Sequence, residues 1–209
     1  MSLISGKPTE EEQKEIKMKI PFADIAPEVW SSLSNLPRTG WLNRKIPNPE
    51  TVKEHTESLI NLASTFEGLT DEERKDLSEM LAVHDWPESV HGDEVILGEE
   101  SDQKAKLMQT KFEKEKSIME KNCKVLGNVC NVIMSLWMRF ETSNDAIATL
   151  ARQLDKYQAV EKASYYEKTT GIKVFKDFFN YSQKFISHPL LLDKIEALES
   201  DWLSLQNKL

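Results

Sequence analysis

The chain has 209 residues, which is long enough for one domain with a sizeable hydrophobic core. Hydrophobic residues make up 39% and charged residues 30%, a balance typical of a soluble globular protein rather than of a disordered one. Because 27 basic residues face 35 acidic ones, the formal charge is −8, which makes bulk nucleic acid an unfavourable partner.

The N-terminus contains a run of glutamates, and we assign residues 1–20 to an acidic N-terminal extension and residues 21–209 to a single domain. No stretch has signal-peptide or transmembrane length, so we expect a cytoplasmic protein without a membrane partner. A short helix is predicted over 26–36, because Pro37 cannot continue it. Residues 38–49 contain a glycine and two prolines, which is typical of a loop.

Two central helices carry recognisable start signals. Asn48 is a suitable cap for a helix over 49–66, with a proline at its first position. Thr70 and Glu73 have the spacing of a capping box, which predicts a second helix over 71–86.

The second half of the chain also has helical periodicity. Residues 89–101 are predicted to be a loop, and 102–140 to be two helices or one bent helix. Further helices are predicted over 144–168, 173–187 and 189–206. The fold class is therefore all-α, with no internal repeat and no domain boundary.

Three polar residues lie on the apolar faces of these helices. His55 follows a valine by three residues and precedes a leucine by four, so it faces the interior. His84 continues an apolar stripe, and Asp155 belongs to a series of otherwise apolar residues spaced by four. A buried carboxylate is normally paired, hydrogen-bonded or bound to metal, because burying it alone is costly.

One explanation accounts for all of these residues and for Asp85, which follows His84. If the helices pack side by side, two imidazoles and two carboxylates suit a divalent cation such as Mn, Fe, Co, Ni or Zn. Taken singly, each residue has another explanation: a hydrogen-bonded core histidine, an aspartate that closes a helix, or an aspartate paired with a nearby Lys or Arg.

Four sequence blocks in order, RTGW, PETVKEH, HDWPESVHGD and QLDKYQAV, resemble the HD-domain phosphohydrolases and in particular their 5′-deoxynucleotidase branch. The resemblance runs from about Arg38 to Tyr166 and is weak over 101–141. It implies an all-helical HD-domain fold with the metal site between core helices, and a homodimer. It implies one divalent metal ion (Mn, Co, Fe, Ni, Zn or Mg) held by His55, His84, Asp85 and Asp155.

The resemblance also implies roles for four other residues. Glu88 corresponds to the catalytic carboxylate, and Asp93 is expected near the sugar. Arg38 and Trp41 are expected to shape the pocket for the nucleotide and its phosphate, although Thr39 and Gly40 separate them here. His91 stands where an aliphatic residue is expected. It could alter substrate choice or face solvent, and we predict that it faces solvent.

The expected activity is metal-dependent hydrolysis of (deoxy)ribonucleoside 5′-monophosphates, so the expected partner is a small nucleotide substrate. One alternative is another small phosphate ester such as a nucleoside triphosphate. A second alternative is a catalytically inactive helical interaction protein, which would use the N-terminal head and the stretch NVCNVIMSLWMRF as binding surfaces.

Overall fold

The computed structural model describes residues 21–96 and 101–206, and these residues form an all-α domain, as predicted. The only β-type pairing among them is an isolated bridge between Pro37 and Thr51. Within the described part of the chain, no helix is both long and apolar enough to span a membrane. The predicted extension over 1–20 lies outside the described residues; its four glutamates are matched by four lysines, so its side chains carry no net charge.

The elements follow the predicted order, with additional short helices. They are α2 (Pro27–Ser34), α3 (Thr39–Leu42), α4 (Val52–Ser64), α5 (Asp71–Val83), α6 (Glu88–His91), α7 (Asp102–Cys123), the 3-10 turn η1 (Lys124–Leu126), α8 (Val129–Thr142), α9 (Ala146–Thr170), α10 (Phe175–Ser182) and α11 (Pro189–Gln206). Two segments predicted as loops thus contain one helical turn each, α3 and α6. The predicted pair of helices over 102–140 is confirmed as α7 and α8, which η1 separates.

The start of α4 differs from the prediction. Its cap is Thr51 rather than Asn48, because the Thr51 hydroxyl accepts from the backbone N–H of Glu54 at 3.2 Å, while the Glu54 carboxylate accepts from Thr51 N at 2.7 Å. Asn48 instead occupies the preceding turn with φ of 48°. The predicted capping box of Thr70 and Glu73 is present at the start of α5.

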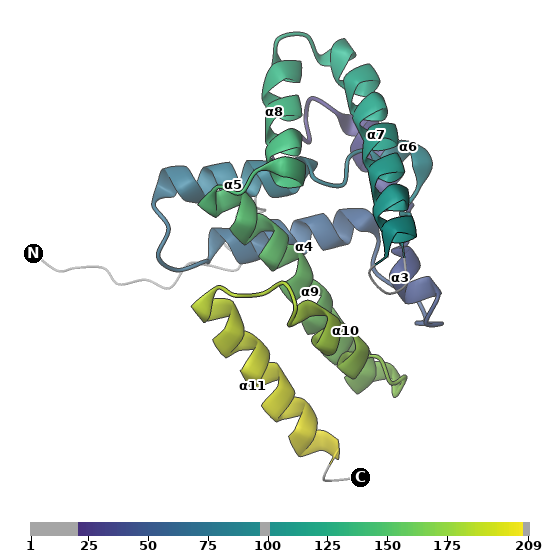
Figure 1. The fold of residues 1–209 in the computed structure, drawn as a ribbon, viewed down its shortest axis with the longest axis vertical. Coiled ribbons are helices and arrows are strands. Elements are labelled where there is room, and N and C mark those ends of the chain that lie inside the picture. The colour runs from purple at the N-terminus through teal and green to yellow at the C-terminus, as the bar shows by residue number, and fades with distance from the viewer. Residues whose placement is uncertain (1–20, 97–100, 207–209) are drawn as a thin grey trace, which may run out of the picture.

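Three helices form the centre of the domain, since α4, α5 and α9 all pack against one another (Figure 1). In Figure 1 α7 and α8 stand together at one end of the molecule, where α8 packs on α5, while α10 and α11 lie beside α9 at the other end. The core includes the fully buried side chains Leu59, Leu77, Leu81, Trp137, Leu154 and Phe175. Each such side chain contributes roughly 1.5–3 kcal/mol of transfer free energy, so apolar packing fixes the relative positions of the central helices.

Candidate metal centre

The three central helices each bring one of the predicted ligands to the same place. His55 lies one turn into α4, His84 directly follows α5, and Asp155 lies in the middle of α9. One ligand atom from each of these residues lies within 4.8 Å of the others. The structure therefore brings together side chains that are up to a hundred residues apart in the sequence.

Asp85 joins this group from the turn after α5. Its Oδ2 atom lies 3.1 Å from His84 Nε2 and 3.9 Å from His55 Nε2. On the other side, Asp155 Oδ1 lies 3.2 Å from the same His55 nitrogen. His55, His84 and Asp155 thus form the mutually close group, and Asp85 adds a carboxylate that contacts both histidines.

Both histidine rings are oriented through their second nitrogen. His55 Nδ1 lies 2.8 Å from the side-chain oxygen of Gln158, and His84 Nδ1 lies 2.7 Å from the backbone oxygen of Leu81. These oxygens only accept, so each Nδ1 donates its hydrogen, and in the neutral ring each Nε2 keeps a lone pair. Both Nε2 atoms are buried, and each lies close to a carboxylate oxygen, His84 Nε2 to Asp85 Oδ2 and His55 Nε2 to Asp155 Oδ1. Such a nitrogen, next to a carboxylate, is what a divalent cation requires of its ligand.

The carboxylates of the centre are held in their charged form. Burial would raise the pKa of Asp85, but the adjacent His84 ring and the Arg38 guanidinium hold it well below its ordinary value. Burial opposes ionisation of Asp155 as well, yet the ammonium of Lys156, 2.7 Å from Oδ2, and the His55 ring keep its pKa low. Both groups are therefore anionic at neutral pH and available to a cation.

The residues predicted to act on the substrate surround the centre. Arg38 donates to Asp85 Oδ2 at 3.1 Å, and Thr39 N donates to Asp93 Oδ2 at 2.6 Å, so these bonds tie the start of α3 to Asp85 and Asp93. Glu88 begins α6, is 6% exposed, and leaves Oε2 without a hydrogen-bond partner among the described residues. Burial, together with the carboxylates of Asp85 and Asp93, raises the pKa of Glu88 well above its ordinary value.

Trp41 occupies a different environment from the other predicted binding residues. It is 3% exposed, its ring stacks on Phe178 at 4.4 Å, and its Nε1 donates to Glu50 Oε1 at 3.1 Å. Trp41 is therefore a packing residue that fixes the α3 segment, which directly follows Arg38.

Sequence reasoning missed a group of charged residues on α7. His91 does not face solvent as predicted, because its side chain is 4% exposed and Nε2 lies 3.2 Å from Glu115 Oε1. Lys111 lies 3.5 Å from the same oxygen; burial would lower its pKa, but Glu115 and then Glu88 raise it. The spacing of Lys111 and Glu115 is that of an ordinary helical ion pair, so the sequence offered no signal that sets them apart.

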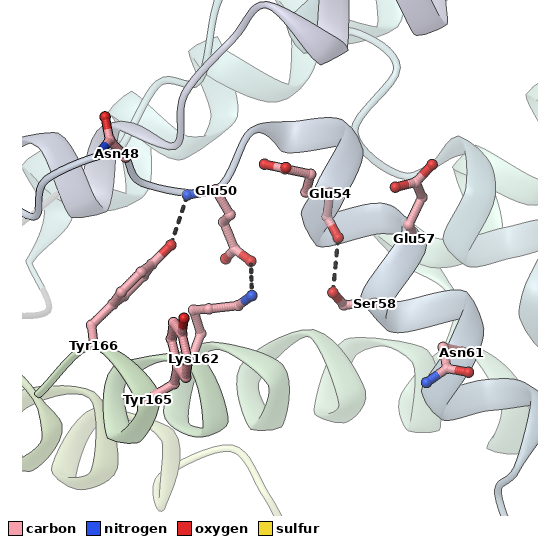
Figure 2. Close-up of a pocket in the computed structure, with 9 residues that line it drawn as sticks. All are labelled: Asn48, Glu50, Glu54, Glu57, Ser58, Asn61, Lys162, Tyr165 and Tyr166. Carbon is pink, nitrogen blue, oxygen red and sulfur yellow. Dashed lines mark hydrogen bonds and ion pairs between the residues drawn. The ribbon is translucent and has the colours of Figure 1, made fainter. Parts of the chain in front are cut away.

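A separate groove of about 480 Å³ opens between α4 and α9 (Figure 2). None of the four predicted metal ligands lines it, so this groove is not the metal centre. It is lined by Asn48, Glu50, Glu54, Glu57, Ser58, Asn61, Lys162, Tyr165 and Tyr166.

The comparisons with known proteins agree with this geometry. A sequence model of the HD domain matches residues 30–191. The 5′-deoxynucleotidase HDDC2 of Xenopus laevis is 31% identical over 173 residues, covering 79% of this chain and 80% of that protein. The 5′-deoxynucleotidase hdd1 of Schizosaccharomyces pombe is 26% identical, covering 90% of this chain and 94% of that protein.

A solved structure shows the same fold. The PH0347 protein from Pyrococcus horikoshii OT3 superposes with a TM-score of 0.62 at 19% sequence identity, covering 81% of this chain and 94% of that chain. Such low identity supports the architecture alone. The match of the HD domain model over residues 30–191 identifies this chain as a member of the HD-domain family.

Proposed function

We propose that this protein is a metal-dependent phosphohydrolase that cleaves (deoxy)ribonucleoside 5′-monophosphates into nucleoside and phosphate. The observation that carries the proposal is the pair of buried Nε2 atoms of His55 and His84, which lie 3.2 and 3.1 Å from carboxylate oxygens of Asp155 and Asp85. Relatives that match about four fifths of the chain are named 5′-deoxynucleotidases, which supports the choice of reaction.

The four ligands are proposed to hold one divalent ion. Two imidazole nitrogens and two carboxylate oxygens suit Mn, Co, Fe, Ni or Zn, and Mg remains a further candidate. An ion bound there would supply Lewis acidity toward the phosphate and lower the pKa of a bound water.

The surrounding residues are proposed to bind and orient the nucleotide. Arg38 would meet the phosphate with a fixed positive charge: burial alone lowers its pKa, but Asp85 and Asp155 raise it above the ordinary value. Glu88 would hold or transfer a proton at its unpaired Oε2. Asp93 uses one oxygen to accept from Thr39 N, which leaves the other oxygen for a sugar hydroxyl. Trp41 would shape the pocket indirectly, because its packing on Phe178 fixes the α3 segment.

The test is phosphate release from a panel of ribo- and deoxyribonucleoside 5′-monophosphates, after the purified protein has been loaded with each candidate metal. Nucleoside and inorganic phosphate are the expected products. Release of pyrophosphate or triphosphate from nucleoside triphosphates would favour the alternative substrate class. No turnover with any metal would favour the inactive interaction protein.

The assembly state and location are also proposals. We infer a homodimer in the cytoplasm, in keeping with the resemblance to the 5′-deoxynucleotidase branch. Light scattering on the eluted protein is expected to give twice the mass of the 24.0 kDa chain, and a monomer mass would contradict the dimer.

A further inference from the structure

A buried chain of hydrogen bonds connects the groove in Figure 2 to the metal centre. Lys162 Nζ lies 3.0 Å from Glu50 Oε2, which also accepts from Gln158 Nε2 at 3.1 Å. The Oε1 atom of Gln158 then lies 2.8 Å from His55 Nδ1. The outer end of this chain, the pair of Glu50 and Lys162, is visible between α4 and α9 in Figure 2.

The direction of every bond in this chain follows from Glu50. An ionised carboxylate only accepts, and Glu50 is paired with Lys162 while it also receives the indole N–H of Trp41. The amide of Gln158 must therefore turn its NH₂ group toward Glu50 and its oxygen toward the ring of His55. That oxygen in turn requires a hydrogen on Nδ1, which in the neutral ring leaves the lone pair on Nε2.

Burial makes this direction costly to reverse. His55 is 0% exposed and Gln158 is 1% exposed, so water cannot replace a partner lost between them; Glu50, which is 5% exposed, lies at the groove end of the chain. The backbone N–H of Glu50 donates to the Tyr166 hydroxyl at 2.7 Å, which fixes the starting point of the chain (Figure 2).

We propose that Gln158 is a positioning residue and that Glu50 is its anchor. Together they hold His55 as the Nδ1–H tautomer, with Nε2 aimed at the metal position. Neither residue is among the proposed ligands or the substrate-binding residues, so their effect passes through His55. This inference rests on the proposed function for its consequence in catalysis, but the tautomer itself is a property of the metal-free protein.

The first experiment compares two buried glutamines on the same helix. Gln158→Met removes the acceptor for His55, whereas Gln153→Met removes an amide whose bonds within the described residues go to Ser187 and His188. Loss of such an outer partner typically weakens metal binding about 10–100-fold. We expect that loss in the Gln158 variant alone, measured by competition with a metal-binding dye, with an unchanged KM for nucleotide at saturating metal.

A rescue experiment separates positioning from a general packing defect. In the Glu50→Gln, Gln158→Glu double variant one carboxylate and one amide exchange places, which restores an acceptor next to His55 Nδ1 and conserves net charge. We expect metal affinity closer to the unsubstituted protein than to Gln158→Met. If the double variant binds metal as weakly as Gln158→Met does, the proposal is contradicted.

The tautomer is read directly by nitrogen NMR of histidine-labelled, metal-free protein in alkaline buffer, with the His55 signal assigned from a His55→Asn spectrum. The Nδ1–H form is expected in the unsubstituted protein and a mixture of tautomers in Gln158→Met. An unchanged tautomer in that variant would overturn the inference. If instead the tautomer responds as expected but the unsubstituted protein binds no metal, the inference stands and the proposed function fails.

Discussion

Glu88 shows how a single residue acquires its chemistry from its surroundings. The residue is 6% exposed, and its position at the start of α6 places it three residues after the proposed ligand Asp85. Burial and the neighbouring carboxylates raise its pKa well above the ordinary value, so a proton is held there more tightly than on a surface glutamate. A group of this kind is suited to general acid–base catalysis.

We expect Glu88→Gln to lower kcat by roughly 100-fold or more, because an amide cannot exchange a proton in the reaction. Metal content should stay the same, since the side chain is not one of the proposed ligands. The measurement is steady-state phosphate release together with metal analysis of the same sample. Glu113→Gln, at an exposed position on α7, is the matched control and should leave kcat unchanged. Full activity of the Glu88 variant would remove it from the mechanism.

At the scale of single elements, two helices begin with the same capping box but only one carries a ligand in its first turn. In α4 the N–H of His55 donates to the backbone oxygen of the cap residue Thr51 at 3.0 Å. In α5 the corresponding cap, Thr70, is a whole helix away from His84. Removing each cap in turn therefore separates two effects: the loss of stability at a helix start, which both caps share, and any effect on the metal site, which only the Thr51 cap can have.

Thr51→Ala and Thr70→Ala should each lower the free energy of unfolding by about 1 kcal/mol, the usual cost of losing a cap. Urea titration measures this cost. Only Thr51→Ala is expected to weaken metal binding as well, because fraying of α4 would loosen His55. Equal metal affinities in the two variants would show that the cap does not position the ligand.

The start of α9 provides a pH-dependent test. Partial burial opposes ionisation of Asp145, but the hydrogen bond from Ala148 N, together with Arg139, lowers the pKa of Asp145 to about 2. A carboxyl group with a lowered pKa stabilises the fold above its unfolded-state pKa and loses this effect as pH falls through the folded-state value.

Asp145→Ala is therefore expected to destabilise the protein by about 1 kcal/mol at neutral pH, the usual cost of losing a cap. The difference from the unsubstituted protein should shrink as pH falls from about 4 toward about 2. Urea unfolding of both proteins, monitored by circular dichroism across this pH range, measures the difference in the free energy of unfolding. Asp145→Asn retains a capping side chain and should cost less. A difference that does not depend on pH would exclude the charge as the cause.

At the scale of the whole molecule, the sequence predicted the fold class and the order of the long helices, because apolar periodicity and caps are local signals. It also predicted that His55, His84 and Asp155 face inward, and packing of α4, α5 and α9 brings them together. The start of α4 was misplaced, because Asn48 and Thr51 are both acceptable caps and only tertiary contacts select between them.

Interactions between distant segments could not be read from the sequence. The contact of His91 with Glu115 depends on how α7 returns over α6, and the bond of Gln158 to His55 joins two helices 103 residues apart. No periodicity distinguishes Gln158 from Gln153, which is a buried glutamine on the same helix with a different partner. Such roles follow only from the packing of the complete domain.

The central claim is that four side chains from three helices hold one catalytic metal ion, and Asp155 is the ligand most distant from the others in the sequence. The most direct measurement is metal content per chain, with phosphate release from a nucleoside 5′-monophosphate, for the unsubstituted protein, for Asp155→Ala and for Asp177→Ala, an exposed control on α10. We predict about one ion per chain and full turnover in the unsubstituted protein and in Asp177→Ala. Both the ion and the turnover should be lost in Asp155→Ala. Retention of metal and turnover by Asp155→Ala would contradict the site.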